Sequence, residues 1–210
     1  MGRRKTTEVD AMATKSRIIE AAENLFREVG YSKTTVADIA SALGMSPANI
    51  YRYFATKAHI NEAICDRLVR HIELRCRESI VRDETSTDRI KRFILEYHKT
   101  IMVNIIKEKR LYDMVSVAMD EHWPVIQEHS ERMMDSLRII IERGISLGEF
   151  RNNNAVETTK TVYQAIAYFI YPSLIEHAVN DAKNNEQAHS MEEDLKQLLD
   201  LILNGLRSGV

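Results

Sequence analysis

One short stretch of the chain gathers an asparagine, an arginine, a lysine and two tyrosines: Asn49, Tyr51, Arg52, Tyr53 and Lys57. Arginine can donate two hydrogen bonds to O6 and N7 of guanine, and asparagine can form the corresponding pair with adenine. Lysine and tyrosine side chains are frequent donors to phosphate oxygens. These residue types therefore favour contact with double-stranded DNA, provided that the fold presents them on one surface.

Two short helices joined by a turn are expected to present these side chains. Thr35 is suited to be an N-cap, and Asp38 completes a capping box for the first helix. Gly44 is placed to end this helix, because glycine adopts a left-handed backbone without strain. Ser46 then caps the second helix. The spacing predicts a helix-turn-helix at about residues 37–56, a motif whose second helix enters the DNA major groove.

The register of the second helix determines which side chains can reach DNA. Ile50 and Phe54 lie four residues apart and share the inward face. The opposite face is then free to meet bases, while helix N-termini and lysine suit phosphates. The alternative is a helical hairpin with a merely solvated polar face, which has no need to group these residue types. The residues expected at DNA are Thr35, Ser46, Pro47, Ala48, Asn49, Tyr51, Arg52, Tyr53 and Lys57.

A set of residues in the N-terminal part of the chain stands at a recognisable spacing: Ile18–Ala22, Leu25–Phe26, Gly30–Tyr31, Thr34–Val36, Ile39–Ala40, Gly44–Ser46, Ile50–Phe54 and Lys57. In these residues the chain resembles the TetR family of transcriptional regulators. That resemblance implies that the positions of Tyr51 and Tyr53 contact the DNA backbone or base methyls, and that Asn49 and Lys57 lie at the DNA. The chain departs from the family at Ala58–His59, where acidic residues often follow the lysine.

The composition is that of a folded helical protein. Of 210 residues, 44% are hydrophobic and 29% are charged, so the chain can bury a core. With 3 Pro, 7 Gly and recurring helical periodicity, the predicted fold class is all-α. No apolar run approaches the ~20 residues of a membrane span, and the start lacks a signal-peptide core. Cys65 and Cys76 fit reduced thiols, so a cytoplasmic location without a membrane partner is expected.

Charge is distributed unevenly along the chain. Residues 1–58 hold 9 Lys and Arg against 6 Asp and Glu, whereas the remainder holds 20 against 25. A basic head on an acidic body is typical of a DNA-reading module joined to a second domain. Arg3, Arg4 and Lys5 belong either to an arm that reaches into a minor groove or to a disordered terminus.

A flexible leader and two domains are expected on these grounds. Residues 1–13 form a flexible basic leader, and residues 14–74 form the helix-turn-helix domain with its linking helix. Residues 75–210 form a domain for effector binding and dimerisation. Pro172 is expected to kink the longest of its helices. The expected helices are Lys15–Val29, Lys57–Val81, Asp88–Lys107, Leu111–Met119, a helix carrying Ile126 to Leu147, Ala155–Asn180 and Met191–Leu206.

The last helix carries a broad leucine stripe. The family resemblance implies that the last two helices pair with their copies in a homodimer, which would place two recognition helices one turn of DNA apart. The alternative is that the stripe covers only the core of its own chain. The expected interface residues are Ile170, Leu174, Leu195, Leu198, Leu199, Ile202 and Leu206.

The family resemblance further implies a cavity for a small-molecule effector that releases the protein from DNA. Aromatic and methionine side chains suit an apolar or aromatic molecule. His98, His122 and His129 could orient it, although their spacing matches no metal site. For each lining residue the alternative is ordinary core. The expected lining residues are Phe93, Tyr97, Ile101, Met114, Met119, Trp123, Met133, Tyr163, Ile166 and Phe169.

The motifs argue against an enzyme. The chain has no HExxH, GxSxG or phosphate-binding loop, and no cofactor, metal or catalytic residue is expected. The sequence thus favours a repressor that a small molecule releases from a near-palindromic operator. The alternatives are an activator with the same head, or a helical interaction module that does not read DNA.

Overall fold

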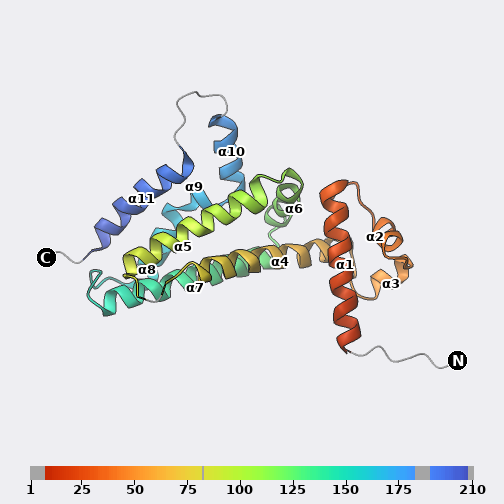
Figure 1. Ribbon diagram of the computed structural model, residues 1–210, viewed down its shortest axis with the longest axis horizontal. Coiled ribbons are helices and arrows are strands. Elements are labelled where there is room, and N and C mark those ends of the chain that lie inside the picture. Colours follow the sequence, from red (N-terminus) through yellow and green to blue (C-terminus); the bar gives the residue numbers. More distant parts are fainter. Residues whose placement is uncertain (1–7, 82, 183–189, 208–210) are drawn as a thin grey trace. The chain divides into compact units, whose positions relative to one another are not determined.

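The computed structural model describes residues 8–81, 83–182 and 190–207, and every regular element within these ranges is a helix. The predicted all-α class is confirmed (Figure 1). No helix within these ranges is long and apolar enough to cross a membrane. The elements are α1 (Glu8–Glu28), α2 (Val36–Ala42), α3 (Pro47–Tyr51), α4 (Lys57–Glu78), α5 (Ser86–Ile101), the π-helix η1 (Met102–Ile106), α6 (Lys109–Asp120), α7 (Pro124–Ser146), α8 (Ala155–Ala165), α9 (Ala167–Ile170), α10 (Pro172–Ala182) and α11 (Met191–Leu206).

The chain divides into two compact units. The head unit comprises Met1–Leu68 with Arg110–Val125, and the body unit comprises Val69–Lys109 with Ile126–Val210. α4 therefore contributes to both units, and nearly all of α6 belongs to the head. The expected division after residue 74 did not include this return of α6, because sequence periodicity shows that a helix is amphipathic but not what it packs against.

The head unit is built on apolar residues of α1, α2, α3 and α4. Ile18, Phe26, Ile39, Ile50 and Ile60 have no exposed surface. Leu111 and Met114 of α6 complete the same core. α1 begins at Glu8, earlier than the expected start at Lys15, so only residues 1–7 of the predicted leader lie outside the described residues.

The long helix expected at residues 155–180 is interrupted twice. α8 ends at Ala165, and the single turn of α9 ends before Pro172, which begins α10. Proline has no N–H to continue a helical ladder, and it suits the first position of a helix. The carbonyl of Phe169 instead accepts a hydrogen bond from the Nδ1–H of buried His98, at 2.7 Å. A tertiary hydrogen bond therefore stabilises the break.

The body unit places α11 alongside α5 (Figure 1). Leu195, Leu199 and Leu203 of α11 are buried within the chain. Cys76 in the body and Cys65 in the head are both free and buried, and burial raises the pKa of both thiols. Neither thiol is therefore readily ionised.

Candidate nucleic-acid interface

The helix-turn-helix begins with the predicted capping box. The Thr35 hydroxyl accepts a hydrogen bond from the Asp38 backbone N–H at 3.2 Å. The Asp38 carboxylate in turn accepts from the Thr35 backbone N–H at 2.8 Å and from its hydroxyl at 2.7 Å. These hydrogen bonds from Thr35 lower the pKa of Asp38. Four residues of sequence thus satisfy the first free amides of α2.

The turn also follows the predicted signals. Gly44 has φ of +63°, the left-handed conformation that glycine adopts without strain. The Met45 N–H donates to the Ala40 carbonyl at 2.8 Å, which closes the turn after α2. The Ser46 hydroxyl accepts from the Asn49 N–H at 3.3 Å and caps α3, with Pro47 at the first position. Local hydrogen bonding therefore sets the angle at which α3 leaves the turn.

α3 presents one face to the head core and the other to solvent. Ile50 is fully buried and Phe54 is 9% exposed, as the register predicted. Ala48 and Arg52 are exposed, and Tyr51 is 52% exposed despite its size. α3 ends at Tyr51, but the Phe54 N–H still donates to the Ile50 carbonyl at 3.1 Å, which keeps Phe54 on the inward face. Ser46 and Pro47 are also exposed, and Asn49 and Tyr53 are partly exposed.

Lys57 has an internal role that its sequence position does not reveal. Its ammonium group donates to the Tyr31 carbonyl at 2.8 Å and to the Thr34 carbonyl at 3.0 Å. It also lies 4.3 Å from the centre of the Tyr31 ring, and burial lowers its pKa. Lys57 therefore ties the start of α4 to the segment between α1 and α2. Since an ammonium carries three protons, one donor is left for the predicted phosphate contact.

Two further residues dock α6 in the head, and no sequence signal identified either. Asn61 of α4 is fully buried and donates from Nδ2 to the Met114 carbonyl at 3.3 Å. Arg110 donates from Nη1 to the Val29 carbonyl at 2.8 Å. Both bonds join residues more than fifty positions apart, which local patterns cannot pair.

Family models match both parts of the chain. The model for bacterial regulatory proteins of the tetR family matches residues 18–64. The model for a tetracyclin repressor-like C-terminal domain matches residues 86–191, half of the chain. The chain belongs to the TetR family of transcriptional regulators. Its head is the family's helix-turn-helix DNA-binding domain, which confirms the predicted resemblance.

Individual TetR-family proteins match different shares of the chain. The transcriptional regulator TtgR of Pseudomonas putida is 41% identical over 64 residues, which is 30% of each protein. CymR of Pseudomonas putida is 26% identical over 145 residues, or 67% of each. A TetR/AcrR regulator from Thermobifida fusca has a TM-score of 0.60 at 23% identity, covering 93% of this chain and 100% of that one. FadR of Bacillus halodurans has a TM-score of 0.62 at 18% identity, covering 93% and 97%. The two structures show the fold alone.

The residues expected to line an effector cavity do not gather in one unit of this TetR-family chain. Met114, Met119 and Trp123 belong to the head unit, and Met114 is fully buried in its core. His122 is exposed, with φ of +54°. The other expected lining residues belong to the body and are all buried, namely Phe93, Tyr97, Ile101, Met133, Tyr163, Ile166 and Phe169.

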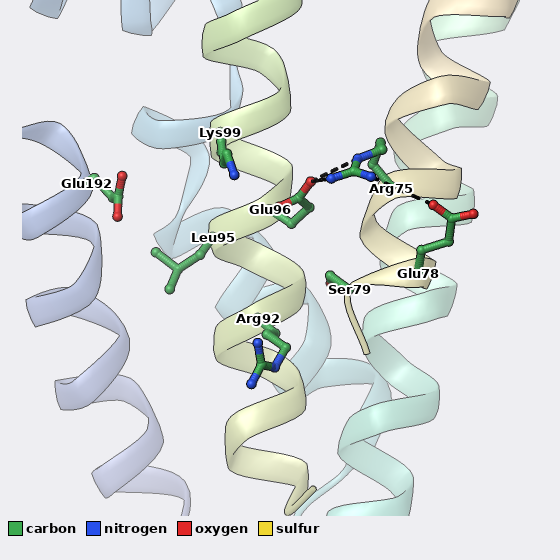
Figure 2. A pocket seen from close by; sticks show the side chains of 8 residues that line it. All are labelled: Arg75, Glu78, Ser79, Arg92, Leu95, Glu96, Lys99 and Glu192. Atoms are coloured by element: carbon green, nitrogen blue, oxygen red, sulfur yellow. Dashed lines mark hydrogen bonds and ion pairs between the residues drawn. The ribbon is translucent and has the colours of Figure 1, made fainter. Parts of the chain in front are cut away.

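The body unit of this TetR-family chain contains a strongly charged pocket of about 380 Å³ between α4, α5 and α11 (Figure 2). Arg75 donates to Glu96 at 2.8 and 3.1 Å, and Arg92 donates from Nε to Glu84 at 2.7 Å. Glu192 pairs with Lys196 at 2.6 Å. Most of the charges at this pocket are thus already paired, which suits an apolar effector poorly.

A second pocket of about 600 Å³ lies between α7 and α8, and Met134, Val156, Tyr163 and Tyr171 contribute to its walls. Tyr163 is therefore the one predicted lining residue that reaches this pocket. Its hydroxyl lies 3.4 Å from that of Tyr97. This second pocket is the better place for an apolar or aromatic molecule.

The residues expected at a dimer interface divide into two sets. Ile170, Leu195 and Leu199 are buried inside the chain, so they cannot contact a partner in this conformation. Leu174 is 42% exposed, while Leu198, Ile202 and Leu206 are partly exposed. The prediction omitted Leu201, which is 73% exposed on α11. Part of the leucine stripe thus covers the core of its own chain, and the pairing of the exposed part with a second copy stays a prediction.

Proposed function

We propose that this protein is a sequence-specific DNA-binding repressor that acts in the cytoplasm as a homodimer and is released from its operator by a small molecule. The observation that carries the proposal is the outward face of α3. Ile50 and Phe54 anchor the helix, while Arg52, Tyr51 and Ala48 remain exposed. Arginine and a small alanine suit base edges in a major groove. Thr35 and Ser46, at the N-termini of α2 and α3, suit phosphates.

The homodimer is supported by a second apolar stripe on α11, beside the buried one. Leu201 and Ile202 line a groove of about 540 Å³ between α8 and α11. Ala165 and Gly205 also line it, and a Cβ added at Gly205 would meet no atom within 4 Å. Small residues permit close helix approach, and exposed leucines supply apolar area to bury. A two-fold axis at this groove would pair α8 and α11 with their copies.

Release by an effector is supported by the course of α4. This helix begins at Lys57, which is bonded within the head, and its last residues belong to the body. The C-terminal part of α4 can adopt more than one position within the body. A ligand that binds the body more tightly in one of these conformations would shift the population toward it, and the head would move with α4. Two heads at a changed separation would no longer match a palindromic operator.

The test is DNA selection followed by binding measurements on the intact protein. Double-stranded DNA selected from random sequence should yield a near-palindrome, with log affinity falling steeply against log salt concentration. Arg52→Ala should weaken binding to that DNA by about 10- to 100-fold and relax the preference at one base pair. Arg77→Ala, an exposed arginine at the end of α4, is the matched control and should leave binding unchanged.

Two results would redirect the proposal. If selection enriches no sequence, the head does not read DNA and the chain is an interaction module. If selection succeeds but the bound protein increases transcription from a reporter, the protein is an activator with the same head.

A further inference from the structure

A chain of hydrogen-bonded side chains runs through the core of the body unit. The Tyr163 hydroxyl lies 3.4 Å from the Tyr97 hydroxyl, which lies 3.1 Å from Nε2 of His129. Nδ1 of His129 lies 2.8 Å from the Glu73 carboxylate. Arg132 donates from Nε to both oxygens of Glu73, at 3.0 and 3.1 Å. Tyr97, His129 and Tyr163 are all nine-tenths or more buried.

The chemistry of Glu73 sets the direction of its hydrogen bonds with His129 and Arg132. Burial raises the pKa of Glu73, but the hydrogen bonds and charges of His129 and Arg132 lower it by more, so the side chain is a carboxylate at neutral pH. A carboxylate only accepts, so Nδ1 of His129 carries the proton. The chain continues from Nε2 of His129 through the Tyr97 hydroxyl to that of Tyr163, and either tyrosine can be the donor between the two hydroxyls. Tyr163 also hydrogen-bonds Ser130, and when it donates its own proton to either neighbour its oxygen keeps one lone pair for a donor from outside the chain.

Tyr163 connects this buried chain to the pocket of about 600 Å³ between α7 and α8. The walls combine apolar and aromatic surface from Met134, Val156 and Tyr171 with the hydroxyl groups of Ser130 and Tyr163. The Ser130 hydroxyl donates to the Ile126 carbonyl at 3.2 Å. The hydroxyls of Ser130 and Tyr163, which hydrogen-bond each other, therefore form a polar group beside the apolar part of the wall.

Two of the charged side chains around the pocket, Arg138 and Asp135, are paired with each other. Arg138 donates to Glu142 at 2.7 Å and to Asp135 at 3.2 Å. Arg138, Asp135, Glu131 and Lys160 line the pocket in addition to its apolar walls. An uncharged ligand with a flat apolar body therefore matches the site better than an ion.

We propose that the pocket between α7 and α8 binds a hydroxylated aromatic effector, whose hydroxyl donates to Tyr163, and that the chain through Tyr97 and His129 transmits binding to Glu73 on α4. This inference rests on the proposed function, because it assigns the effector site of a DNA-binding regulator. An aromatic hydroxyl meets both requirements of the site, since its ring fills apolar space and its O–H reaches an acceptor. Each hydrogen bond in the chain changes when Tyr163 moves toward the ligand.

α4 is a suitable receiver for this change. Its residue Glu73 hydrogen-bonds two residues of α7, His129 and Arg132. Arg132 leaves Nη2 buried and without a hydrogen bond in this conformation. The α4–α7 contact therefore has an unused donor with which a shifted Glu73 can form a new bond. Alternative hydrogen-bonding arrangements of comparable energy are what a two-state element requires.

The first test measures binding to the intact protein by calorimetry with two matched probes. Para-phenylphenol carries one aromatic hydroxyl, and para-methoxybiphenyl has the same rings but no O–H to donate. We expect para-phenylphenol to bind about tenfold or more tightly than its methyl ether, the effect of one hydrogen bond to a buried acceptor. Tyr163→Phe should remove this difference. Tyr168→Phe, a 47% exposed tyrosine on α9, is the matched control and should preserve it.

The second test separates binding from transmission. Tyr97 does not line the pocket, so Tyr97→Phe should keep para-phenylphenol affinity within a few-fold while abolishing ligand-induced release from the selected DNA. Thermal unfolding of each variant verifies its fold. Equal affinity for the two probes, absence of binding by both, or normal release in Tyr97→Phe overturns the inference. Failure of the ligand-free protein to bind any DNA overturns the proposed function instead, since the calorimetry does not depend on DNA.

Discussion

Leu201→Glu should dissociate the dimer while each protomer remains folded. Leu201 is 73% exposed on α11 and lines the groove between α8 and α11. Glutamate favours helices, so the change leaves helix propensity nearly unaltered. Any loss of assembly would therefore come from the surface and not from unfolding of α11.

The size of the effect follows from the exposed area. Full burial of a leucine side chain contributes about 1.5–3 kcal/mol, so burying three quarters of it contributes about 1–2 kcal/mol. A two-fold axis places the residue in the interface twice, which gives about 2–4 kcal/mol per dimer. The dimer dissociation constant should then rise by about 30- to 1,000-fold, before the added cost of desolvating two carboxylates.

Sedimentation equilibrium across a range of protein concentrations measures this shift, and DNA binding reports its consequence. The variant should bind a half-site normally but lose the avidity of two linked heads on the full palindrome. Ile139→Glu, at a 61% exposed position within α7, is the matched control and should assemble like the unaltered protein. An unchanged dissociation constant for Leu201→Glu would refute the placement of the interface at this groove.

Two further predictions concern stability. Lys57→Gln should lower the free energy of unfolding by about 1–3 kcal/mol, because the change removes a charged donor shared by the Tyr31 and Thr34 carbonyls. Urea unfolding measures this loss. If the stability is unchanged while DNA binding weakens, Lys57 acts only at phosphate. Glu73→Gln should lower stability at neutral pH, because His129 and Arg132 hold the pKa of Glu73 below its ordinary value of 4.5. A lowered pKa stabilises the fold above about pH 4.5, and this stabilisation is lost as pH falls through the folded-state value. The stability difference between Glu73→Gln and the unaltered protein should therefore shrink below that pH in thermal unfolding, and a constant difference would contradict the argument.

The sequence alone determined the helix-turn-helix, because the signals that build it act over a few residues. The capping box of Thr35 and Asp38, the left-handed turn at Gly44 and the cap at Ser46 are each complete within one helical turn. Apolar spacing likewise determined that Ile50 and Phe54 face inward. Residue identity and helical period suffice for such features.

Only the tertiary structure decided which helix packs against which. It placed α6 in the head through Leu111 and Met114, and it occupied the Lys57 ammonium with carbonyls from the segment between α1 and α2. It also divided the leucine stripe of α11, burying Leu195 while leaving Leu198 partly exposed. Periodicity identifies an apolar face but not the surface that covers it.

The polar chain in the body shows the same limit most clearly. Glu73, Tyr97, His129 and Tyr163 come from α4, α5, α7 and α8, and their hydrogen bonds span 32 to 66 positions. The sequence singled out His129 and both tyrosines as possible ligand contacts, but it paired none of them. Hydrogen bonds between distant residues form only after helices dock, so their partners depend on packing that no local pattern encodes.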